Sequence, residues 1–200
     1  MGRNPALNKM LKDKRREEIL SSALELFSSN GYSATKISQI AQQTGMSQGL
    51  LYHYFSSKEQ IYIEIVRDAF SRLNAACLSL ESSHLPPGEK ISRALEVLLE
   101  NLETSPDAAR YHVLIAQANI SDAVPEDARR IIQTESPLPY EIIGRILAAG
   151  QKEGSIRAGD PGQLSTAFWT TIKGLALHKA VHRSRGALPD ASLFKPLFLT

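Results

Sequence analysis

Hydrogen-bonding side chains are concentrated in the short segment from Ser47 to Phe55. In a helix over this segment, successive residues would be about 100° apart, which gives the helix two distinct faces. The apolar face consists of Leu51, Tyr54 and Phe55, and the free face consists of Gly49, Tyr52 and His53. A free face with hydrogen-bonding aromatic residues, where a solvated helix would carry Lys and Glu, suits a groove of DNA.

The chemistry available to this free face is the recognition of base edges. The amide of Gln48 can bond to both N6 and N7 of adenine. Gly49 lets the backbone approach the groove closely, because it has no side chain. Tyr52 and His53 can contact thymine methyl groups, base edges or phosphates. This segment is therefore the predicted reading element.

Other residues are expected to hold the phosphate backbone of the DNA. Lys58, just after the reading segment, is placed to bind a phosphate. Thr35 and Lys36 are expected at the start of the preceding helix, where unpaired amides attract an anion. The basic surplus of the chain also lies in this part. Residues 1–60 hold eight Lys and Arg against five Asp and Glu, whereas residues 61–200 hold fifteen against sixteen.

A basic arm, residues 1–16, precedes the first clear helical pattern. Its charged residues are Arg3, Lys9, Lys12, Lys14, Arg15 and Arg16, opposed only by Asp13. Such an arm either neutralises DNA phosphates or forms a solvated tail. Charge alone does not decide between these two readings.

The reading segment is predicted to be the third of three helices, of which the second and third are short. The first ends near Asn30–Gly31 and shows apolar residues at helical spacing. These residues are Ile19, Leu20, Ala23, Leu26 and Phe27. The second helix is expected to begin after a cap at Thr35 and to stop at Gly45, and the third to be capped by Ser47. The turn between the second and third helices is short and contains Gly45, which is typical of a DNA-binding helix-turn-helix.

In order and spacing, the segment from Arg15 to Ile65 resembles the TetR family of bacterial regulators. The resemblance implies a three-helix DNA-binding domain, an all-α regulatory domain and a homodimer built mainly from the last two long helices. It places the DNA contacts in the second and third helices and just after them. These contacts are Thr35, Lys36, Ser38, Ser47, Gln48, Gly49, Tyr52, His53, Tyr54 and Lys58. No motif of the family is evident beyond about residue 80.

The whole sequence predicts an all-α protein of about nine helices, because helical periodicity recurs between Pro- and Gly-containing breaks. No run of alternating β-branched residues is long enough to indicate a strand. We expect a helix-turn-helix DNA-binding domain over residues 1–56 and a ligand-binding and dimerisation domain over residues 57–200. A long helix starting after Ser57 is expected to connect them.

Two late helices, Tyr140–Glu153 and Pro161–His182, are candidates for the dimer interface. In the second, larger residues recur at spacings of mostly four and three, with small residues beside them. The proposed seam consists of Leu164, Phe168, Thr171, Leu175 and His178, with Ala167, Gly174 and Ala176 as small neighbours. Periodicity alone fits burial within one subunit equally well, and the family resemblance favours the dimer.

A few polar or aromatic residues lie within otherwise apolar helices and are candidates for binding a small molecule. They are Tyr111, His112, Gln117, Asn119 and Trp169. Each of them is also compatible with a satisfied position in the core, so only their convergence in space would indicate a pocket. The ligand is unidentified, and no cofactor is predicted.

Composition and motifs argue against several other classes of protein. The 42% hydrophobic and 22% charged residues are ordinary for a soluble globular chain. No apolar stretch approaches the ~18 residues of a membrane span. The N-terminus lacks a secretory signal, so a cytoplasmic, nucleoid-associated location is expected. No glycine-rich phosphate loop or nucleophile motif indicates an enzyme.

Cysteine and histidine offer little further chemistry. Cys77 is the only cysteine, so no intrachain disulfide forms, and its apolar neighbours favour a buried core thiol over a redox sensor. His178 and His182 are spaced as in some metal sites. A third ligand is missing and their neighbours are cationic, so no metal site is predicted.

Two functions remain as hypotheses. The first is a transcriptional regulator, a repressor released from a palindromic operator on double-stranded DNA by a small-molecule inducer. The alternative is a chromosome-organising or division-coupling protein that uses the same module without a small-molecule switch. Genome-wide occupancy separates them, since a regulator binds few sites and the alternative binds many.

Overall fold

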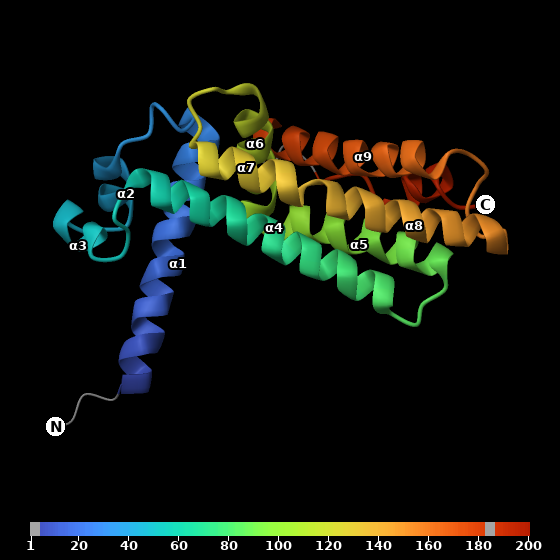
Figure 1. The fold of residues 1–200 in the computed structure, drawn as a ribbon, viewed down its shortest axis with the longest axis horizontal. Helices are drawn as coiled ribbons and strands as arrows, with labels where there is room; N and C mark the ends of the chain where they lie inside the picture. The colour runs from blue at the N-terminus through green and yellow to red at the C-terminus, as the bar shows by residue number, and fades with distance from the viewer. Residues whose placement is uncertain (1–4, 183–186) are drawn as a thin grey trace.

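The protein consists of α-helices that pack into two regions (Figure 1). The computed structural model describes residues 5–182 and 187–200. The helices of these residues are α1 (Pro5–Asn30), α2 (Ile37–Gln43), α3 (Gln48–Tyr52), α4 (Lys58–Ser82), α5 (Pro87–Thr104), α6 (Pro106–Ile120), α7 (Glu126–Glu135), α8 (Pro137–Glu153) and α9 (Pro161–His182), followed by the 3-10 turns η1 (Ala191–Leu193) and η2 (Lys195–Leu197). None of them is long and apolar enough to cross a lipid bilayer. Over the described residues, the predicted all-α fold of about nine helices is confirmed.

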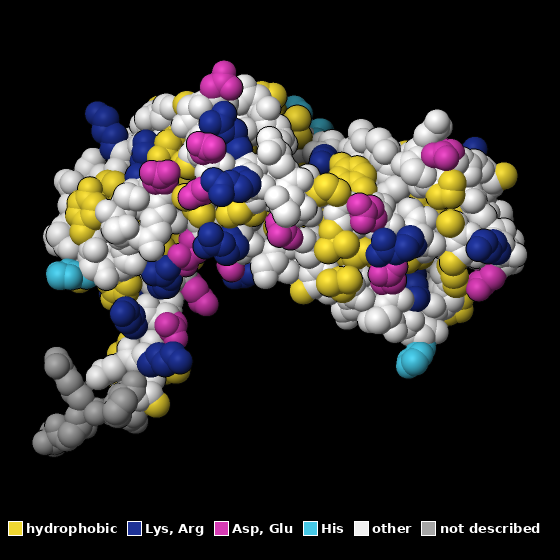
Figure 2. Space-filling view, in the orientation of Figure 1, with side chains coloured by type: hydrophobic (Ala, Val, Ile, Leu, Met, Phe, Trp, Pro, Cys, Tyr) yellow, Lys and Arg dark blue, Asp and Glu magenta, His cyan; other side chains and the backbone are white. Residues whose placement is uncertain are grey.

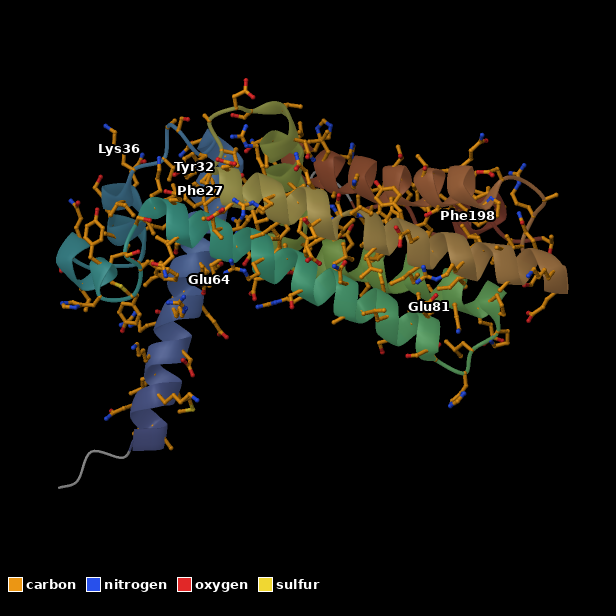
Figure 3. The ribbon with its side chains drawn as sticks, in the orientation of Figure 1. Phe27, Tyr32, Lys36, Glu64, Glu81 and Phe198 are labelled. Carbon is orange, nitrogen blue, oxygen red and sulfur yellow. The ribbon has the colours of Figure 1, made fainter. Side chains whose placement is uncertain are left out.

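The first packed region joins α1, α2 and α3 to the beginning of α4 and to parts of α6 and α7. α1 buries one face, on which Ile19 and Phe27 have no exposed surface. The rings of Phe27 and Tyr32 each meet Tyr62 edge to face with centroids 5.1 Å apart. Figure 3 shows Phe27 and Tyr32 close to the start of α4. This aromatic group fixes the end of α1 against α4.

The second packed region consists of α5, α8, α9 and the C-terminal residues, with Ala109 of α6. Leu147, Phe168 and Phe198 are completely buried in it. α4 contributes to both regions, because Phe70 packs in the first and Cys77 in the second. A movement of α4 would therefore change the packing of both regions.

The C-terminal residues return to the second region and complete its core. Phe198 packs edge to face on Phe168 with ring centroids 5.6 Å apart. Its carbonyl accepts a hydrogen bond from the Arg157 amide at 2.9 Å, and the Thr200 hydroxyl donates to the Gly154 carbonyl at 2.8 Å. Figure 3 shows Phe198 near the end of α8, far from α2 and α3.

The N-terminal arm was expected to precede the first helix. Its described part instead belongs to α1, which is helical from Pro5 onward. Ala, Leu, Met and Lys favour helix, and proline is tolerated at the first helical position. Figure 1 shows that this part of α1 stands away from the packed body. Residues 1–4 of the predicted arm lie outside the described residues.

Part of the seam predicted on α9 faces the protomer's own core. Phe168 and Ala176 have no exposed surface, and Leu164 and Leu175 pack against the second region. For these residues the helical spacing belongs to burial within one subunit. The outward face of α9 carries His178 of the predicted seam and its small neighbours Ala167 and Gly174, together with Leu177 and Val181.

Cys77 is buried on α4 and forms no disulfide. Burial, with a smaller contribution from the charge of Glu81, raises the pKa of its thiol to about 11. A thiol with a raised pKa is protonated near neutral pH and reacts slowly. The geometry thus supports the core role and gives no support to a redox sensor.

His112, half buried on α6, provides a test of the packing between α6 and α9. Burial, aided by the nearby Lys173 ammonium, lowers the pKa of His112 to about 4, from a usual value of 6.5. Below pH 6.5 the His112 side chain therefore binds a proton in the unfolded chain but not in the folded chain. The free energy of unfolding falls as the pH drops towards 4. We expect His112 to cost about 2 kcal/mol of unfolding free energy between pH 7 and 4.5.

Urea unfolding at these two pH values measures that cost. The variant His112→Gln should lose less stability on acidification than the native protein. His84→Gln, a change at an exposed histidine, serves as the matched control. Equal pH dependence of the native protein and His112→Gln would contradict the prediction.

Candidate nucleic-acid interface

The helix-turn-helix is formed by α2, a glycine turn and α3. Gly45 has a φ of 66°, a left-handed conformation that favours glycine, and it follows the end of α2. The Met46 amide then bonds back to the Ala41 carbonyl at 2.8 Å, which closes the turn. The hydroxyl of Ser47 accepts a hydrogen bond from the Leu50 amide at 3.1 Å. Ser47 is therefore the N-cap of α3, as predicted from the sequence.

The two faces of the reading segment are distributed in the structure as expected. Leu51 and Phe55 are buried in the first packed region, and Tyr54 is half buried against it. The opposite face is open, and Tyr52 exposes 51% of its surface. The other exposed residues of α3 and its cap are Ser47, Gln48, Gly49, Leu50 and His53. A Cβ added at Gly49 would meet no atom closer than 4.0 Å, so its backbone is open to an approaching surface.

Thr35 has a different role from the predicted one. The N-cap of α2 is Lys36, whose amide donates to the side-chain oxygen of Gln39 at 2.8 Å. The Thr35 side chain has no exposed surface, and its hydroxyl lies 2.8 Å from the Gly31 carbonyl and 3.2 Å from the Leu26 carbonyl. The predicted cap at Thr35 is wrong, because its hydroxyl donates instead to carbonyls at the C-terminal end of α1 and just after it. Its side chain cannot reach a phosphate.

Lys58 is also engaged inside the protein. Its ammonium donates to the carbonyl of Tyr32 at 2.8 Å and to the carbonyl of Thr35 at 2.9 Å. It also lies 4.2 Å from the centre of the Tyr32 ring. Partial burial lowers the pKa of Lys58. Lys58 is the first residue of α4, and these contacts connect it to the turn between α1 and α2. They revise its predicted role as a phosphate ligand.

Lys36 and Ser38 are the predicted contacts on α2 that remain available. Both side chains are exposed, on the same end of the molecule as α3. Figure 3 shows the Lys36 side chain extending away from the helix bundle. These two residues are well placed to contact a phosphate backbone beside the reading helix.

Arg16 was grouped with the basic arm in the sequence, but it joins three helices. Its guanidinium donates to Glu64 on α4, with one bond of 2.8 Å and a second that is shorter. It also donates to the Tyr54 carbonyl at 2.9 Å and lies 4.1 Å from the centre of the Phe55 ring. Arg16 thereby connects α1 to α4 and to the residues that follow α3. No sequence signal joins residues so far apart in the chain.

The five residues predicted to bind a ligand do not converge on one cavity. Tyr111 packs against the first region and Trp169 is buried in the second. Gln117 donates to the Ser28 carbonyl on α1 at 3.0 Å, and Asn119 is exposed. The indole N–H of Trp169 is buried without a hydrogen-bond partner among the described residues. Of the predicted set, only Trp169 thus presents a buried polar atom that is free to bind another group.

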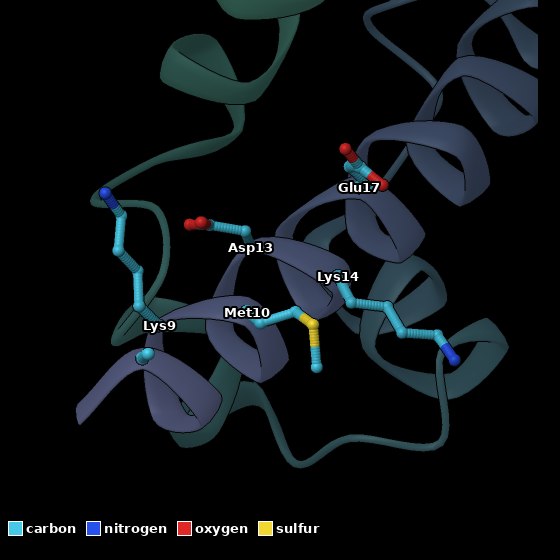
Figure 4. Close-up of a pocket in the computed structure, with 6 residues that line it drawn as sticks. Lys9, Met10, Asp13, Lys14 and Glu17 are labelled. Carbon is cyan, nitrogen blue, oxygen red and sulfur yellow. The ribbon is translucent and has the colours of Figure 1, made fainter. Parts of the chain in front are cut away.

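Two hollows on the surface have different character. One is a shallow groove along the N-terminal part of α1, where every lining residue belongs to the same helix (Figure 4). The other lies between α8 and α9 and is mainly apolar. It is lined by Tyr140, Glu141, Gly144, Arg145, Ala148, Pro161, Gly162, Ser165 and Thr166. Neither hollow contains any of the five predicted ligand residues. Among the described side chains, no group of three or more metal-ligating residues comes together.

Comparison with known proteins agrees with this arrangement. The profile of bacterial regulatory proteins of the tetR family matches residues 19–65. The chain is 32% identical over 175 residues to the HTH-type transcriptional repressor KstR2 of Rhodococcus jostii (strain RHA1), which covers 84% of this chain and 83% of that protein. It is 28% identical over 165 residues to the HTH-type transcriptional regulator RutR of Escherichia coli (strain K12), with coverage of 81% and 74%.

Solved structures share the fold at lower identity. The ketosteroid transcriptional regulator KstR2 of Mycobacterium tuberculosis has a TM-score of 0.75 and 21% identity, covering 93% of this chain and 95% of that one. AibR, solved in complex with isovaleryl coenzyme A and operator DNA, has a TM-score of 0.75 and 18% identity, covering 92% and 98%.

The family follows from the two findings together. The profile match covers the helix-turn-helix that the geometry builds, and the identity to the KstR2 repressor extends over most of both chains. The chain belongs to the TetR family of bacterial regulatory proteins and is a transcriptional regulator.

Proposed function

We propose that this regulator binds a palindromic operator as a homodimer and represses transcription until a small molecule releases it. The observation that carries the proposal is the open face of α3, on which Gln48, Gly49, Tyr52 and His53 are exposed while the opposite face is buried. In a symmetric dimer the two copies of α3 would enter successive major grooves, about 34 to 36 Å apart.

The DNA contacts of this proposal are a revised set. Gln48, Gly49, Tyr52 and His53 approach the bases. Three residues at or next to exposed helix N-termini contact the phosphate backbone of the DNA, namely Lys36, Ser38 and Ser47. Tyr54 is half buried and presents only part of its side chain. Thr35 and Lys58 support the turn from within, as their hydrogen bonds to carbonyls indicate.

The outward faces of α8 and α9 are the proposed dimer interface. The groove between them is apolar, and small residues at Gly144 and Ala148 allow close approach of another helix pair. Leu177 and Val181 extend this surface, with 52% and 64% of their area exposed. A second copy related by twofold symmetry would cover the same face on both subunits.

A ligand is proposed to act through α4. Structural relatives include AibR in complex with isovaleryl coenzyme A and a FadR from Bacillus subtilis in complex with stearoyl-CoA. In this chain we propose the neighbourhood of Trp169 and His112, between α6 and α9, as the ligand site. The unpartnered indole N–H of Trp169 supports it. The ligand weakens DNA binding only if it prefers the protein with α4 displaced.

The alternative of a chromosome-organising protein has no contact in the structure that favours it. The relatives of this chain, KstR2 and RutR, carry the names of transcriptional regulators. Genome-wide occupancy distinguishes the two functions. Binding at one or a few promoters supports the regulator, and dozens of sites along the chromosome would support the alternative.

Replacing Gln48 with Ala should reduce the preference for the selected operator over a mismatched one. Loss of a two-point contact to adenine is expected to cost about 1–3 kcal/mol of discrimination, or roughly 5- to 150-fold. Binding to both duplexes at fixed salt measures this preference. Gln133→Ala, at an exposed position on α7, is the matched control. Unchanged discrimination in both Gln48→Ala and Tyr52→Ala would remove α3 from the reading role.

Replacing Lys58 with Met should destabilise the protein more than it changes phosphate binding. The substitution leaves the carbonyls of Tyr32 and Thr35 without their shared donor, which is expected to cost about 1–3 kcal/mol of unfolding free energy. Chemical unfolding and the salt dependence of DNA binding provide the two readouts. Native stability with a salt slope reduced by about one contact would restore Lys58 to a phosphate role.

Replacing Ala148 with Glu should separate the dimer. The new carboxylate would lie in the mainly apolar groove between α8 and α9, where an opposing subunit would bury it while the nearby Arg145 is already paired with Glu81. Sedimentation at equal concentrations is expected to give a dimer for the native protein and a monomer for the variant. Ala75→Glu, at an exposed position on α4, should remain dimeric. A dimeric Ala148→Glu variant would place the interface elsewhere.

A further inference from the structure

The two packed regions meet at a polar residue in the middle of α4. Phe70 packs in the first region and Cys77 in the second, and Asn74 lies between them on the same face of the helix. The surface of Asn74 is only 7% exposed. Its amide nitrogen donates to a carboxylate oxygen of Glu135, the last residue of α7, at 2.8 Å. Its amide oxygen Oδ1 is buried without a hydrogen-bond partner among the described residues.

Trp169 on α9 presents a second unpartnered polar atom, the indole N–H described above. The side chain is 2% exposed and packs in the second region together with Cys77. The centres of the Trp169 and Tyr140 rings are 5.9 Å apart, and Tyr140 lies in the first turn of α8. α8 begins two residues after α7 ends at Glu135. Asn74 and Trp169 therefore both contact residues beside the junction between α7 and α8.

The two atoms have opposite hydrogen-bonding character. Asn74 Oδ1 accepts, whereas Trp169 Nε1 donates. Rotating the Asn74 amide by half a turn would place its oxygen against the Glu135 carboxylate, another acceptor, so the amide keeps its orientation. Buried polar atoms in proteins nearly always have a partner, because losing contact with water without a new bond is unfavourable. One molecule with a donor and an acceptor at separate places would satisfy both atoms.

The surroundings of the junction favour an uncharged molecule. The Glu135 carboxylate is already bonded to Asn74. The Lys173 ammonium donates to the Tyr140 hydroxyl at 2.7 Å. Burial, with a smaller contribution from Lys173, lowers the pKa of His112 to about 4, so its imidazole is uncharged near neutral pH. On the surface over α7, positive and negative side chains are mixed, as Figure 2 shows. A charged ligand group buried here would therefore lack a free counter-charge among the described side chains.

We propose that the small molecule binds between the two packed regions, where it donates a hydrogen bond to Asn74 and accepts one from Trp169. This inference rests on the proposed function, because it names the chemistry of the ligand which that function requires. The part of the ligand held here is uncharged and mostly apolar, with a hydroxyl or an amide N–H as the donor and a carbonyl as the acceptor.

Binding at this place involves α4 directly. Neither surface hollow is lined by Asn74 or Trp169, so we expect the ligand to enter by separating the two packed regions. Asn74 is part of α4, the same helix that carries Lys58 and Glu64 at its DNA-binding end. A ligand bonded to Asn74 therefore acts on this helix without an intermediate element.

The test uses straight-chain hydroxyketones of increasing length, with the hydroxyl and the carbonyl at opposite ends. Each is compared with the ketone that lacks the hydroxyl and the alcohol that lacks the carbonyl, by calorimetric titration of the full-length protein. The native protein should bind the best hydroxyketone about 2- to 12-fold more tightly than either analogue, because each analogue loses one hydrogen bond. Asn74→Leu should remove only the preference over the ketone, and Trp169→Phe only the preference over the alcohol.

Two controls accompany these titrations. Asn101→Leu, at an exposed position on α5, is the matched variant and should keep both preferences. Trp169 is the only tryptophan of the chain, so its emission spectrum in the native protein should change as the hydroxyketone binds. This measurement and the comparison of the three probes need no variant, so they test the proposal even where a substitution prevents folding.

Equal binding of the three probes by the native protein would overturn the proposal and assign the two atoms to water. An emission spectrum that stays constant at saturation would also overturn it, as would a folded variant that keeps both preferences. Selection of DNA from a random pool tests the proposed function separately. If the native protein selects no DNA, the proposed function fails, whereas selected DNA together with equal binding of the probes ends only this inference.

Discussion

The Arg16 guanidinium is the interaction on which the geometry of the DNA-binding end depends. It bonds to Glu64 on α4 and to the Tyr54 carbonyl after α3, and it covers the ring of Phe55. A planar guanidinium with five donors can satisfy a carboxylate and a carbonyl at once, whereas a lysine ammonium in its place could not match the carboxylate at two points. The orientation of α3 is thereby fixed relative to both α1 and α4.

Lys58 complements this junction from the other side. Its ammonium donates to two carbonyls of the turn that precedes α2, so α4 is connected to this turn through Lys58 and to Arg16 through Glu64. α4 then continues into the second packed region through Cys77. Since a rigid helix moves as a unit, a displacement of α4 by a ligand would turn the reading helix with it. The structure thus contains a direct physical link between the two regions.

The sequence was informative where a local pattern determines the structure. The helix-turn-helix, the cap at Ser47 and the two faces of α3 follow from spacing within one or two turns, and they agree with the structure. Thr35 and Lys58 could not be placed correctly, because their partners are carbonyls, which carry no mark in the sequence. On α9 the periodicity was real, but spacing cannot say whether the buried face of Phe168 meets the same chain or another. Spacing likewise could not show that Tyr111 and Trp169, both proposed for ligand binding, lie in different packed regions.

The buried position of Phe198 has a consequence for synthesis of the chain. The first packed region is complete once Ile132 is available, whereas the second requires a residue almost at the C-terminal end of the described chain. The DNA-binding end can therefore begin to fold while the remainder is still on the ribosome. The second region, with its exposed apolar helices, stays unfinished until Phe198 has been synthesised, and this interval is when a chaperone would be most needed.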